Sequence, residues 1–352
     1  MDKPFLKKLR RIAPYVPGEQ PQRGDILKLN ANENPYPPAP GVQQALRSFD
    51  ASSLALYPDA GGKALKTALA GRFSVKPTQV FLGNGSDDVL ALAFQSFFCS
   101  DQPILYPDIT YSFYPVWCDL FRIPYETVPL DENFCVNMRD YDKPNGGVIL
   151  PNPNAPTGRA LPLDALETLL QHNADCVVII DEAYVDFGAQ SAVPLIEKYE
   201  NLLVVQTMSK SRSLAGLRIG YALGSETLIA TLEAVKNSYN SYTLDAVALA
   251  AGAASVADEA YFQQTCRKVV TTRERTADAL RALGFLVPPS LTNFLFVTHP
   301  QRDAAGLFAT LRDRGIFIRY FKLPRIDNYL RITVGTDAQM DRLLAALRDI
   351  LS

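Results

Sequence analysis

Short apolar segments alternate with amphipathic segments between about residue 78 and residue 224. Many of the apolar segments are rich in β-branched residues, which is typical of strands. Two of the segments between them, residues 87–98 and 163–172, have a helical pattern. Regular alternation of this kind predicts an α/β fold with a mostly parallel central sheet between layers of helices. The strands that we predict are residues 79–82, 103–106, 124–128, 148–150, 176–180, 202–206 and 218–223.

Polar clusters follow several of these strands directly. The segment 176–180 is apolar without alternation, as expected for a strand buried on both faces, and Asp181-Glu182 follows it. Similar clusters occur at residues 83–87, 152–154 and 209–210. Ligands of open α/β sheets bind at the carboxyl ends of the strands. The clusters therefore predict one binding site along that edge of the sheet.

The pattern changes after residue 225. Residues 257–283 read as one long helix or a bent pair of helices that ends at Gly284, and a capping box at Thr336 begins a final helix. Between them we predict strands at residues 294–297, 317–320 and 330–334, and a helix over 303–314. We therefore predict three parts: a proline-rich N-terminal arm (1–40), a large domain (41–255) and a smaller C-terminal α+β domain (256–352).

Composition and charge narrow the class of protein. Of the 352 residues 47% are hydrophobic and 20% are charged, which are ordinary values for a globular protein. The net charge of −2 provides no positive field for nucleic acid or an anionic membrane. The basic start of the chain lacks the apolar stretch of a secretory signal, and we find no apolar run of about 18 residues. We expect a cytoplasmic protein with no nucleic-acid or membrane partner.

The cysteines and histidines argue against a metal site. Five scattered cysteines include no CxxC pair, and neither His172 nor His299 has a cysteine or histidine at ligand spacing. We therefore expect reduced thiols and no metal. The chain also has no G-x-S-x-G turn, which disfavours a hydrolase with a Ser-His-Asp triad.

A glycine-containing turn at residues 83–88 joins the first predicted strand to an apolar helix. Glycines at such a junction let the backbone approach an anion closely, and the N–H groups at the helix start favour phosphate. A simple turn with an aspartate as helix cap explains the same residues. The motif alone leaves both interpretations open.

The cluster Asp181-Glu182-Ala183-Tyr184 offers a carboxylate at a strand end. Such a carboxylate could pair with a cationic ring nitrogen, and the positive charge would lower the carboxyl pKa. The alternative is that Asp181 only caps the following helix.

Lys210 directly follows another predicted strand in the segment Thr207-Met208-Ser209-Lys210. Desolvation at such a position makes a lysine amine a usable nucleophile and base. The hydroxyls of Thr207 and Ser209, with Arg218 eight residues beyond the lysine, would suit a phosphate. A lysine that reaches solvent from a loop is the alternative.

Together the three motifs fit a single cofactor. The amine at position 210 follows the carboxylate at position 181 by 29 residues (210 − 181), one strand further along the chain. A phosphorylated pyridine aldehyde needs phosphate donors, a carboxylate for its ring nitrogen and an amine for its aldehyde. We therefore predict pyridoxal 5'-phosphate (PLP), held by Lys210 as a Schiff base.

At these residues the chain resembles the fold type I PLP enzymes, the aspartate aminotransferase superfamily. The shared motifs are Asn-x-Pro-Thr-Gly at 154–158, Asp-Glu-Ala-Tyr at 181–184, Ser-Lys at 209–210, and Arg331 within Leu-Arg-Ile-Thr-Val-Gly. The segments 32–36 (Asn-Glu-Asn-Pro-Tyr) and 57–59 (Tyr-Pro-Asp) resemble the histidinol-phosphate aminotransferase branch. The resemblance extends from residue 29 to residue 336. It implies a homodimer with shared active sites.

The resemblance implies three catalytic residues. Lys210 would bind the cofactor and move the proton, Asp181 would keep the ring nitrogen protonated, and Tyr184 would hydrogen-bond to the phenolic oxygen. Asn154 is implied as a second contact to that oxygen. Many relatives have a second asparagine where this chain has Ala155, so which of the two positions makes the contact stays open.

Further residues are implied for binding. Tyr111 would stack on the cofactor ring, Arg331 would bind the substrate α-carboxylate, and Asn32 would contact the substrate. Arg319 is implied for a substrate phosphate, with Lys322 or Arg325 as alternatives. The implied contacts to the cofactor phosphate are the backbone N–H groups of Ser86 and Asp87, the side chains of Thr207, Ser209 and Arg218, and Tyr57 from a partner subunit, which would also reach the substrate.

The resemblance further implies a reaction in two half-reactions. Histidinol phosphate and 2-oxoglutarate would give imidazole acetol phosphate and glutamate, a step of histidine biosynthesis. The alternatives on this fold are an aromatic or other amino-acid aminotransferase and a threonine-phosphate decarboxylase of cobalamin synthesis. A PLP-binding transcription regulator would need a helix-turn-helix module before about residue 30, and the sequence provides none there.

Overall fold

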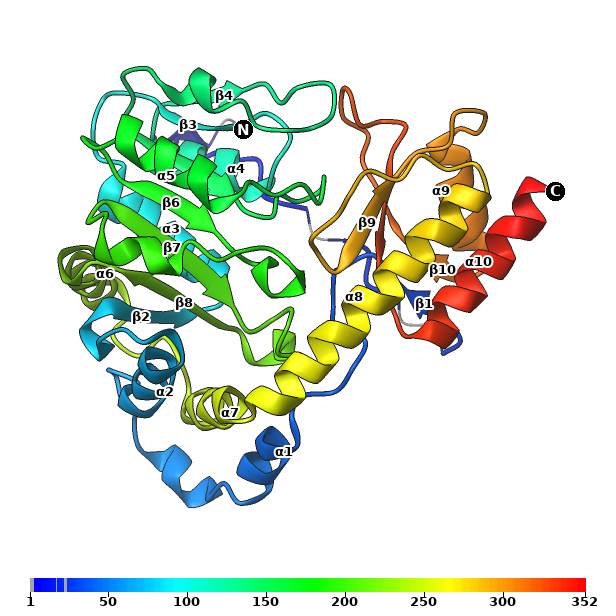
Figure 1. Ribbon diagram of the computed structural model, residues 1–352. Coiled ribbons are helices and arrows are strands. Elements are labelled where there is room, and N and C mark those ends of the chain that lie inside the picture. Colours follow the sequence, from blue (N-terminus) through cyan, green and yellow to red (C-terminus); the bar gives the residue numbers. More distant parts are fainter. Residues whose placement is uncertain (1–2, 17, 22–23) are drawn as a thin grey trace.

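Seven strands form the main sheet of the computed structural model, which describes residues 3–16, 18–21 and 24–352 (Figure 1). Their order is β2-β8-β7-β6-β5-β3-β4. Strand β8 runs antiparallel to both of its neighbours, and the remaining pairs are parallel. Every predicted strand of this region is present, with ends that differ by at most two residues, so the α/β prediction is confirmed. The strands are β2 (Val80–Asn84), β3 (Ile104–Pro107), β4 (Tyr125–Val128), β5 (Gly147–Pro151), β6 (Val178–Asp181), β7 (Leu202–Thr207) and β8 (Ile219–Gly224).

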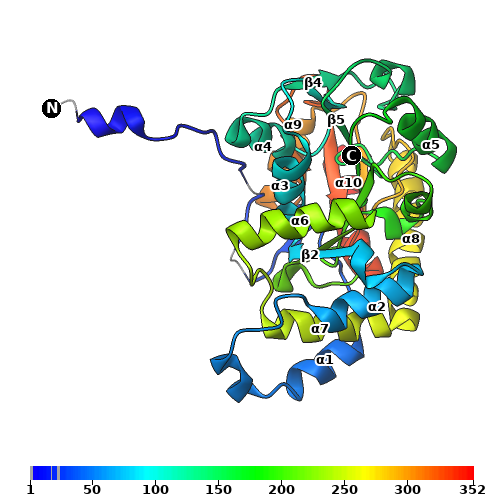
Figure 2. The same ribbon diagram turned by 90° about the vertical axis from the view of Figure 1, so that its left-hand side faces the viewer.

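Helices cover both faces of this sheet, as Figures 1 and 2 show. The alternation of side chains along each strand divides the core: Ile179 packs on one face, and Val178 and Ile180 pack on the other. The helices on the Ile179 face are α3 (Ser86–Phe97), α4 (Phe113–Phe121) and α6 (Glu226–Tyr239). Those on the opposite face are α1 (Pro40–Arg47), α2 (Lys63–Phe73), α5 (Leu163–His172) and α7 (Ala246–Ala257).

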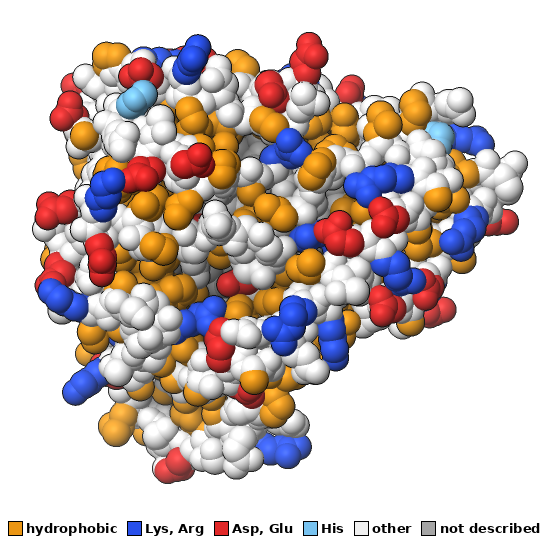
Figure 3. Space-filling model, viewed as in Figure 1, with side chains coloured by type: hydrophobic (Ala, Val, Ile, Leu, Met, Phe, Trp, Pro, Cys, Tyr) orange, Lys and Arg blue, Asp and Glu red, His pale blue; other side chains and the backbone are white. Residues whose placement is uncertain are grey.

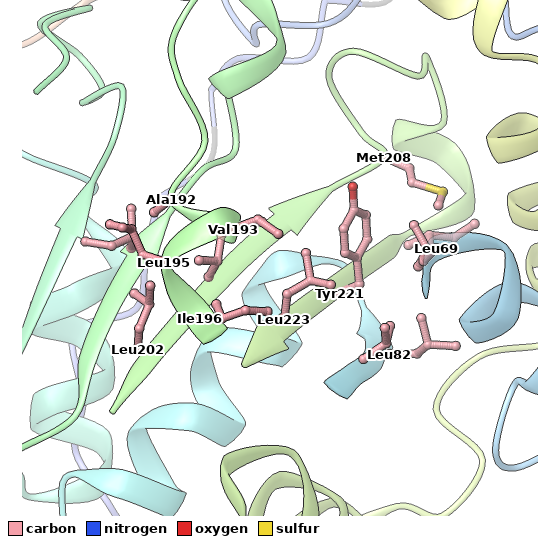
Figure 4. Close-up of a cluster of buried hydrophobic side chains, with 14 of the residues drawn as sticks. Leu69, Leu82, Ala192, Val193, Leu195, Ile196, Leu202, Met208, Tyr221 and Leu223 are labelled. Atoms are coloured by element: carbon pink, nitrogen blue, oxygen red, sulfur yellow. The ribbon is translucent and has the colours of Figure 1, made fainter. Parts of the chain in front are cut away.

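The core on the second face also includes a short 3-10 helix, η6 (Val193–Glu197). In Figure 4 the side chains of Ile196 and Val193 lie beside Leu223 and Tyr221 of β8. Leu69 of α2 continues the same apolar layer toward Met208, just beyond the end of β7. This packing holds the carboxyl end of β7, and so the residues that follow it, in one position.

The C-terminal region has a sheet of its own in the order β11-β12-β9, with antiparallel pairs. The single helix α8 leads to it from the main sheet, so one long helix, rather than a bent pair, follows Asp258 (Figure 1). The predicted strand at 317–320 is two short strands, because β10 pairs with β1 and β11 pairs with β12. The elements are α8 (Glu259–Ala282), β9 (Phe294–Val297), α9 (Ala304–Asp313), β10 (Ile316–Phe317), β11 (Arg319–Tyr320), β12 (Leu330–Thr333) and α10 (Asp337–Leu351).

The N-terminal segment lies against this region. Strand β1 (Leu27–Lys28) pairs in parallel with β10, and Leu27 is buried in the core of the C-terminal region. Before it, the chain passes along α4, and the helix η1 (Pro4–Lys8) extends away from the rest of the chain in Figure 2. The other 3-10 helices are η2 (Ala51–Ala55), η3 (Pro77–Gln79), η4 (Met138–Tyr141), η5 (Val185–Phe187) and η7 (Ala215–Leu217).

The predicted helix ends are observed in the C-terminal region. Gly284 follows α8 with a φ of 88°, a conformation that favours glycine. The Thr336 hydroxyl accepts a hydrogen bond from the backbone N–H of Gln339, and the Gln339 side chain accepts one from the backbone N–H of Thr336. These bonds satisfy N–H groups that an α-helix leaves unpaired at its start.

The surface carries charges of both signs. Lys, Arg, Asp and Glu side chains are interspersed over the face that Figure 3 shows. Among the described residues, no helix is both long enough and apolar enough to cross a lipid bilayer.

Gly220 of β8 provides a test of how closely the main sheet packs against the turn after β2. A Cβ atom at this position would overlap the backbone of Gly85 and Ser86. We expect Gly220→Ala to lower the free energy of unfolding by about 1–3 kcal/mol, measured by urea denaturation.

Gly71→Ala is the matched control, because a Cβ atom there meets no other atom within 4 Å. This change within the exposed face of α2 should instead stabilise the protein by about 0.5–1 kcal/mol. Equal stability of the two variants would contradict the close contact at Gly220.

Candidate active site

A cavity of about 270 Å³ lies at the carboxyl ends of β5, β6 and β7. Its walls come from the main sheet, the N-terminal segment and the C-terminal sheet, so residues far apart in sequence meet there. The structure brings together twelve of the residues that the sequence predicted: Asn32, Ser86, Asp87, Tyr111, Asp181, Tyr184, Thr207, Ser209, Lys210, Arg218, Arg319 and Arg331.

One end of the cavity gathers donors for an anion. Helix α3 begins at Ser86, directly after Gly85, whose φ of 85° places it in the region that favours glycine. Arg218 lies across this turn, with Nη1 3.5 Å from Oγ of Ser209 and Nη2 3.2 Å from a carboxylate oxygen of Asp87. A guanidinium, hydroxyl groups and a helix N-terminus together suit a phosphate.

Asp181 ends β6 and is buried at the base of the cavity. Its carboxylate accepts hydrogen bonds from the Tyr114 hydroxyl (2.9 Å) and from the backbone N–H of Ala183 (3.2 Å). Burial raises the pKa of Asp181 to about 6, although these hydrogen bonds and the nearby Lys210 act to lower it. Without a bound ligand, the pKa of Asp181 is therefore raised. The lowered pKa that the sequence predicted requires a cation, such as a protonated ring nitrogen, next to this carboxylate.

The neighbouring carboxylate, Glu182, faces away from the cavity. It accepts hydrogen bonds from the Ser191 hydroxyl, the backbone N–H of Ala192 and the Gln206 side chain. Burial raises the pKa of Glu182 to about 7. Of these two acids, Asp181 lines the cavity and can contact a bound molecule. Glu182 instead fixes the position of the neighbouring backbone through its hydrogen bonds.

Lys210 follows β7 and its amine reaches into the cavity. Its Nζ donates to the carbonyl oxygen of Ala31 at 3.3 Å and lies 5.9 Å from the centre of the Tyr184 ring. Tyr111 lies on another wall, where its hydroxyl donates to Asp87 at 2.8 Å. The amine is therefore held between the sheet edge and the N-terminal segment.

Two arginines from neighbouring strands form the wall on the C-terminal side. Arg319 of β11 and Arg331 of β12 are paired in register. Arg331 donates to the carbonyl oxygen of Asn30 at 3.1 Å, while its Nε has no hydrogen-bond partner among the described residues. Burial lowers the pKa of Arg331, and the charge of Arg319 lowers it further. Two neighbouring cations on one partly buried wall favour the binding of anions.

Of the three candidates for a substrate phosphate, only Arg319 lines the cavity. Arg325 instead binds the Asp108 carboxylate and the carbonyl oxygen of Leu130, both at 2.8 Å. Lys322 is exposed outside the cavity.

Asn154 does not line the cavity, and its contact with the cofactor ring stays a prediction. Its amide nitrogen donates to the carbonyl oxygen of Ile109 (2.9 Å) and to the Thr157 hydroxyl (3.0 Å). Its amide oxygen accepts from the Thr110 hydroxyl at 3.1 Å. These bonds fix the loop, and Ala155, which carries no polar side chain, occupies the place on the cavity wall.

Tyr57 also lies outside this cavity. Its side chain is 82% exposed and stacks on Tyr242 with 4.6 Å between ring centres. Because the sequence assigned it to the cavity of a partner subunit, the single chain does not test that role.

The structure adds residues that sequence reasoning missed. Tyr15 and Gln20 of the N-terminal segment line the cavity, as does Phe321 after β11. The Tyr15 ring stacks on Phe113 at 4.2 Å, a contact between segments about a hundred residues apart. Tyr114, the partner of Asp181, could have been noticed as an aromatic residue one helical turn after Tyr111.

Comparison with known proteins identifies the class. The model of the family described as aminotransferase class I and II matches residues 24–347, and the chain belongs to this family.

Relatives within the family are more specific. Histidinol-phosphate aminotransferase 2 of Dechloromonas aromatica (strain RCB) is 56% identical over 97% of both chains. The histidinol-phosphate aminotransferase of Acinetobacter baumannii (strain SDF) is 57% identical over 97% of this chain and 96% of the relative. The structure of the Sinorhizobium meliloti histidinol-phosphate aminotransferase in complex with pyridoxal-5'-phosphate has a TM-score of 0.84 at 28% identity, covering 93% of this chain and 91% of that one. The chain thus falls among the histidinol-phosphate aminotransferases.

The raised pKa of Asp181 predicts a pH-dependent cost in stability. The folded-state pKa of about 6 exceeds the ordinary value of 3.8, so folding favours the protonated acid. Asp181 therefore lowers stability progressively as the pH rises from about 4 through 6. We expect Asp181→Asn to stabilise ligand-free protein by about 1–3 kcal/mol at pH 8, with the difference vanishing toward pH 4.

Urea denaturation at several pH values measures this difference. The exposed Asp101→Asn serves as the control and should change the free energy of unfolding by less than about 0.5 kcal/mol at every pH. A constant difference between wild type and Asp181→Asn across the pH range would contradict the elevated pKa.

Proposed function

We propose that this protein uses PLP to transfer the amino group of histidinol phosphate to 2-oxoglutarate, giving imidazole acetol phosphate and glutamate in histidine biosynthesis. The pair of arginines that lines the same cavity as the Lys210 amine is the observation that carries the proposal. Family membership and the named relatives support it.

The cavity residues fit PLP by chemistry and charge. The donors around Arg218, Ser209 and the start of α3 suit its phosphate. The buried carboxylate of Asp181 suits a protonated ring nitrogen, and the Lys210 amine suits the aldehyde. Bound PLP supplies an electron sink that stabilises the negative charge left when a proton leaves the substrate carbon.

The remaining chemistry belongs to side chains of this protein. The Nζ of Lys210 would remove the proton from the substrate α-carbon. It would then deliver this proton to a carbon atom of the bound cofactor. Asp181 stays ionised beside the positive ring and so keeps that ring electron-poor. Tyr111 and Tyr184 both line the cavity, where Tyr111 would cover one face of the ring and Tyr184 would bind its phenolic oxygen.

Both substrates carry anions that match the arginine wall. Arg331 binds the α-carboxylate of the amino-acid partner, since a guanidinium can donate two parallel hydrogen bonds to a carboxylate. Arg319 binds the phosphate of histidinol phosphate, and Asn32 helps to shape this side of the cavity. An aromatic amino acid carries one carboxylate and would engage only one of these cations. Threonine phosphate carries a carboxylate and a phosphate and would engage both, and release of CO₂ distinguishes a decarboxylase.

We further propose a homodimer with shared active sites. Apolar side chains cluster at an exposed position after η2, where Leu56 is 75% exposed and Tyr57 is 82% exposed. Tyr57 would enter the cavity of the partner subunit and reach cofactor phosphate and substrate there. The projecting helix η1, with no buried residue, supports a second contact between subunits (Figure 2).

Three parts of the chain are proposed to act as an N-terminal arm (1–40), a large domain (41–255) and a small domain (256–352), in a cytoplasmic enzyme. The pairing of β1 with β10 supports an arm that ends on the small domain. The Arg319 and Arg331 wall then belongs to the small domain, and the PLP site belongs to the large one.

Single half-reactions test the substrate. Purified protein mixed with histidinol phosphate, without 2-oxoglutarate, should lose the visible absorption of bound PLP and form imidazole acetol phosphate in equal amount. Half-conversion should need at least roughly ten-fold less histidinol phosphate than phenylalanine, because the phosphate of histidinol phosphate engages Arg319 and phenylalanine has no group for that arginine. A preference for phenylalanine, or release of CO₂, would overturn the assignment of substrate.

Variants of the arginine wall test the phosphate contact. Arg319→Ala should raise the KM for histidinol phosphate by roughly 10- to 100-fold, since charge-assisted hydrogen bonds are lost, and should change the glutamate half-reaction much less. The exposed Lys322→Ala is the control and should change KM by no more than about two-fold. Equal effects of Arg319→Ala on both half-reactions would argue against a phosphate-specific role.

A further inference from the structure

A series of hydrogen bonds connects β12 to the Tyr184 hydroxyl through Asn32. Asn32 is 1% exposed, and its Nδ2 donates to the Oη of Tyr184 at 2.9 Å. Its Oδ1 accepts from the Thr333 hydroxyl at 3.1 Å, and its backbone N–H donates to the same hydroxyl at 3.0 Å. Asn32 and Thr333 lie 301 residues apart in the chain.

The donors in this series have one consistent direction. A backbone N–H can only donate, so the Thr333 hydroxyl accepts from Asn32 and gives its own proton to the Asn32 amide oxygen. The amide NH₂ group must then face Tyr184, whose hydroxyl accepts. The proton of the Tyr184 hydroxyl remains available, and no acceptor for it is found in the described part of the chain. Tyr184 lines the cavity, so this proton can be donated to a bound molecule.

The loop that contains Asn154 and Ala155 offers no free side-chain donor to the cavity. The amide of Asn154 is already bonded to Thr157 and to Ile109 and Thr110 of another segment, and Ala155 has no polar side chain. The free proton of the Tyr184 hydroxyl is therefore suited to bind a negatively charged ring oxygen.

We propose that Asn32 and Thr333 are positioning residues that orient the Tyr184 hydroxyl as a donor to the phenolic oxygen of PLP. The inference rests on the proposed placement of the PLP ring between Asp181 and Lys210. It also adds a role for Asn32. The sequence implied that Asn32 contacts the substrate, whereas here it acts by orienting Tyr184.

Strand β12 thereby contributes both to the proposed cofactor contact, through Thr333, and to the proposed substrate contact, through Arg331. Thr333 and Arg331 are two residues apart on β12, and side chains at this spacing point to the same side of a strand. A movement of β12 that follows carboxylate binding at Arg331 would also change the hydrogen bonds that orient Tyr184.

The pH titration of bound PLP tests the inference. The proton in question is shared by the phenolic oxygen of PLP and the Lys210 nitrogen that binds the cofactor. The visible absorption changes when this proton is lost. A hydrogen bond to that oxygen favours the deprotonated form, so loss of the donor raises the midpoint. We expect Tyr184→Phe to raise the midpoint by about one to two pH units.

Two variants interrupt the series before it reaches the tyrosine. Asn32→Gly removes the amide, and glycine suits the φ of 54° at this position. Thr333→Val removes the hydroxyl that fixes the amide. Each should raise the midpoint by roughly half a unit to one unit and weaken PLP binding by ligand-free protein about two- to ten-fold.

Matched controls separate positioning from a general effect on structure. Thr333→Ser keeps the hydroxyl and should restore the wild-type midpoint. In the Tyr184→Phe background, Asn32→Gly should add no further shift, because its effect passes through the missing hydroxyl. A cooperative thermal unfolding transition should be measured for every variant, to verify that each one folds.

The inference is overturned if Asn32→Gly and Thr333→Val leave the midpoint unchanged while Tyr184→Phe moves it. It is equally overturned if Asn32→Gly shifts the midpoint as much without the tyrosine hydroxyl as with it. A wild-type protein that binds no PLP would instead overturn the proposed function, and this inference with it.

Discussion

The structure depends on charged groups of opposite sign that are kept apart from water and from one another at the two sides of one cavity. Asp181 is buried with hydrogen bonds that do not offset its desolvation, and half-buried Arg331 has a buried Nε without a hydrogen-bond partner among the described residues. Neither group has an ion-pair partner among the described residues. Each is therefore costly in the chain alone and is stabilised by a ligand that carries the complementary charge. A zwitterionic assembly of cofactor and amino acid meets both demands at once.

The fold provides this arrangement through strands that end at one edge. The parallel strands β5, β6 and β7 bring Asp181 and the segment leading to Lys210 side by side. The antiparallel strand β8 then returns the chain so that Arg218 lies over the turn before α3. The C-terminal sheet faces this edge, and the charged side chains that it contributes among the described residues are Arg319 and Arg331, both cations. The charge pattern of the cavity thus follows from which sheet forms which wall.

Local patterns in the sequence were sufficient to predict the strands of the main sheet and the polar residues that follow them. Unbroken apolar runs predicted the buried strands, and the residue types that follow them predicted the cofactor-binding side of the cavity. Asn154 and Ala155 show where this reasoning ends, because the direction of a loop side chain depends on packing that no local pattern encodes. Tyr15 and the link from Asn32 to Thr333 bring together segments that are distant in the chain, so only the folded structure reveals them.

The pairing of β1 with β10 has a consequence for the order in which the protein is completed on the ribosome. Leu27 lies opposite Ile316, so the segment that carries Asn30 and Asn32 has no strand partner until nearly the whole polypeptide has been synthesised. The seven-stranded sheet can form during translation, whereas the wall that the N-terminal segment supplies closes only after Ile316, about nine-tenths of the way along the 352 residues, has been added. A nascent or prematurely terminated chain would therefore present the reactive lysine without the groups that orient its reactants.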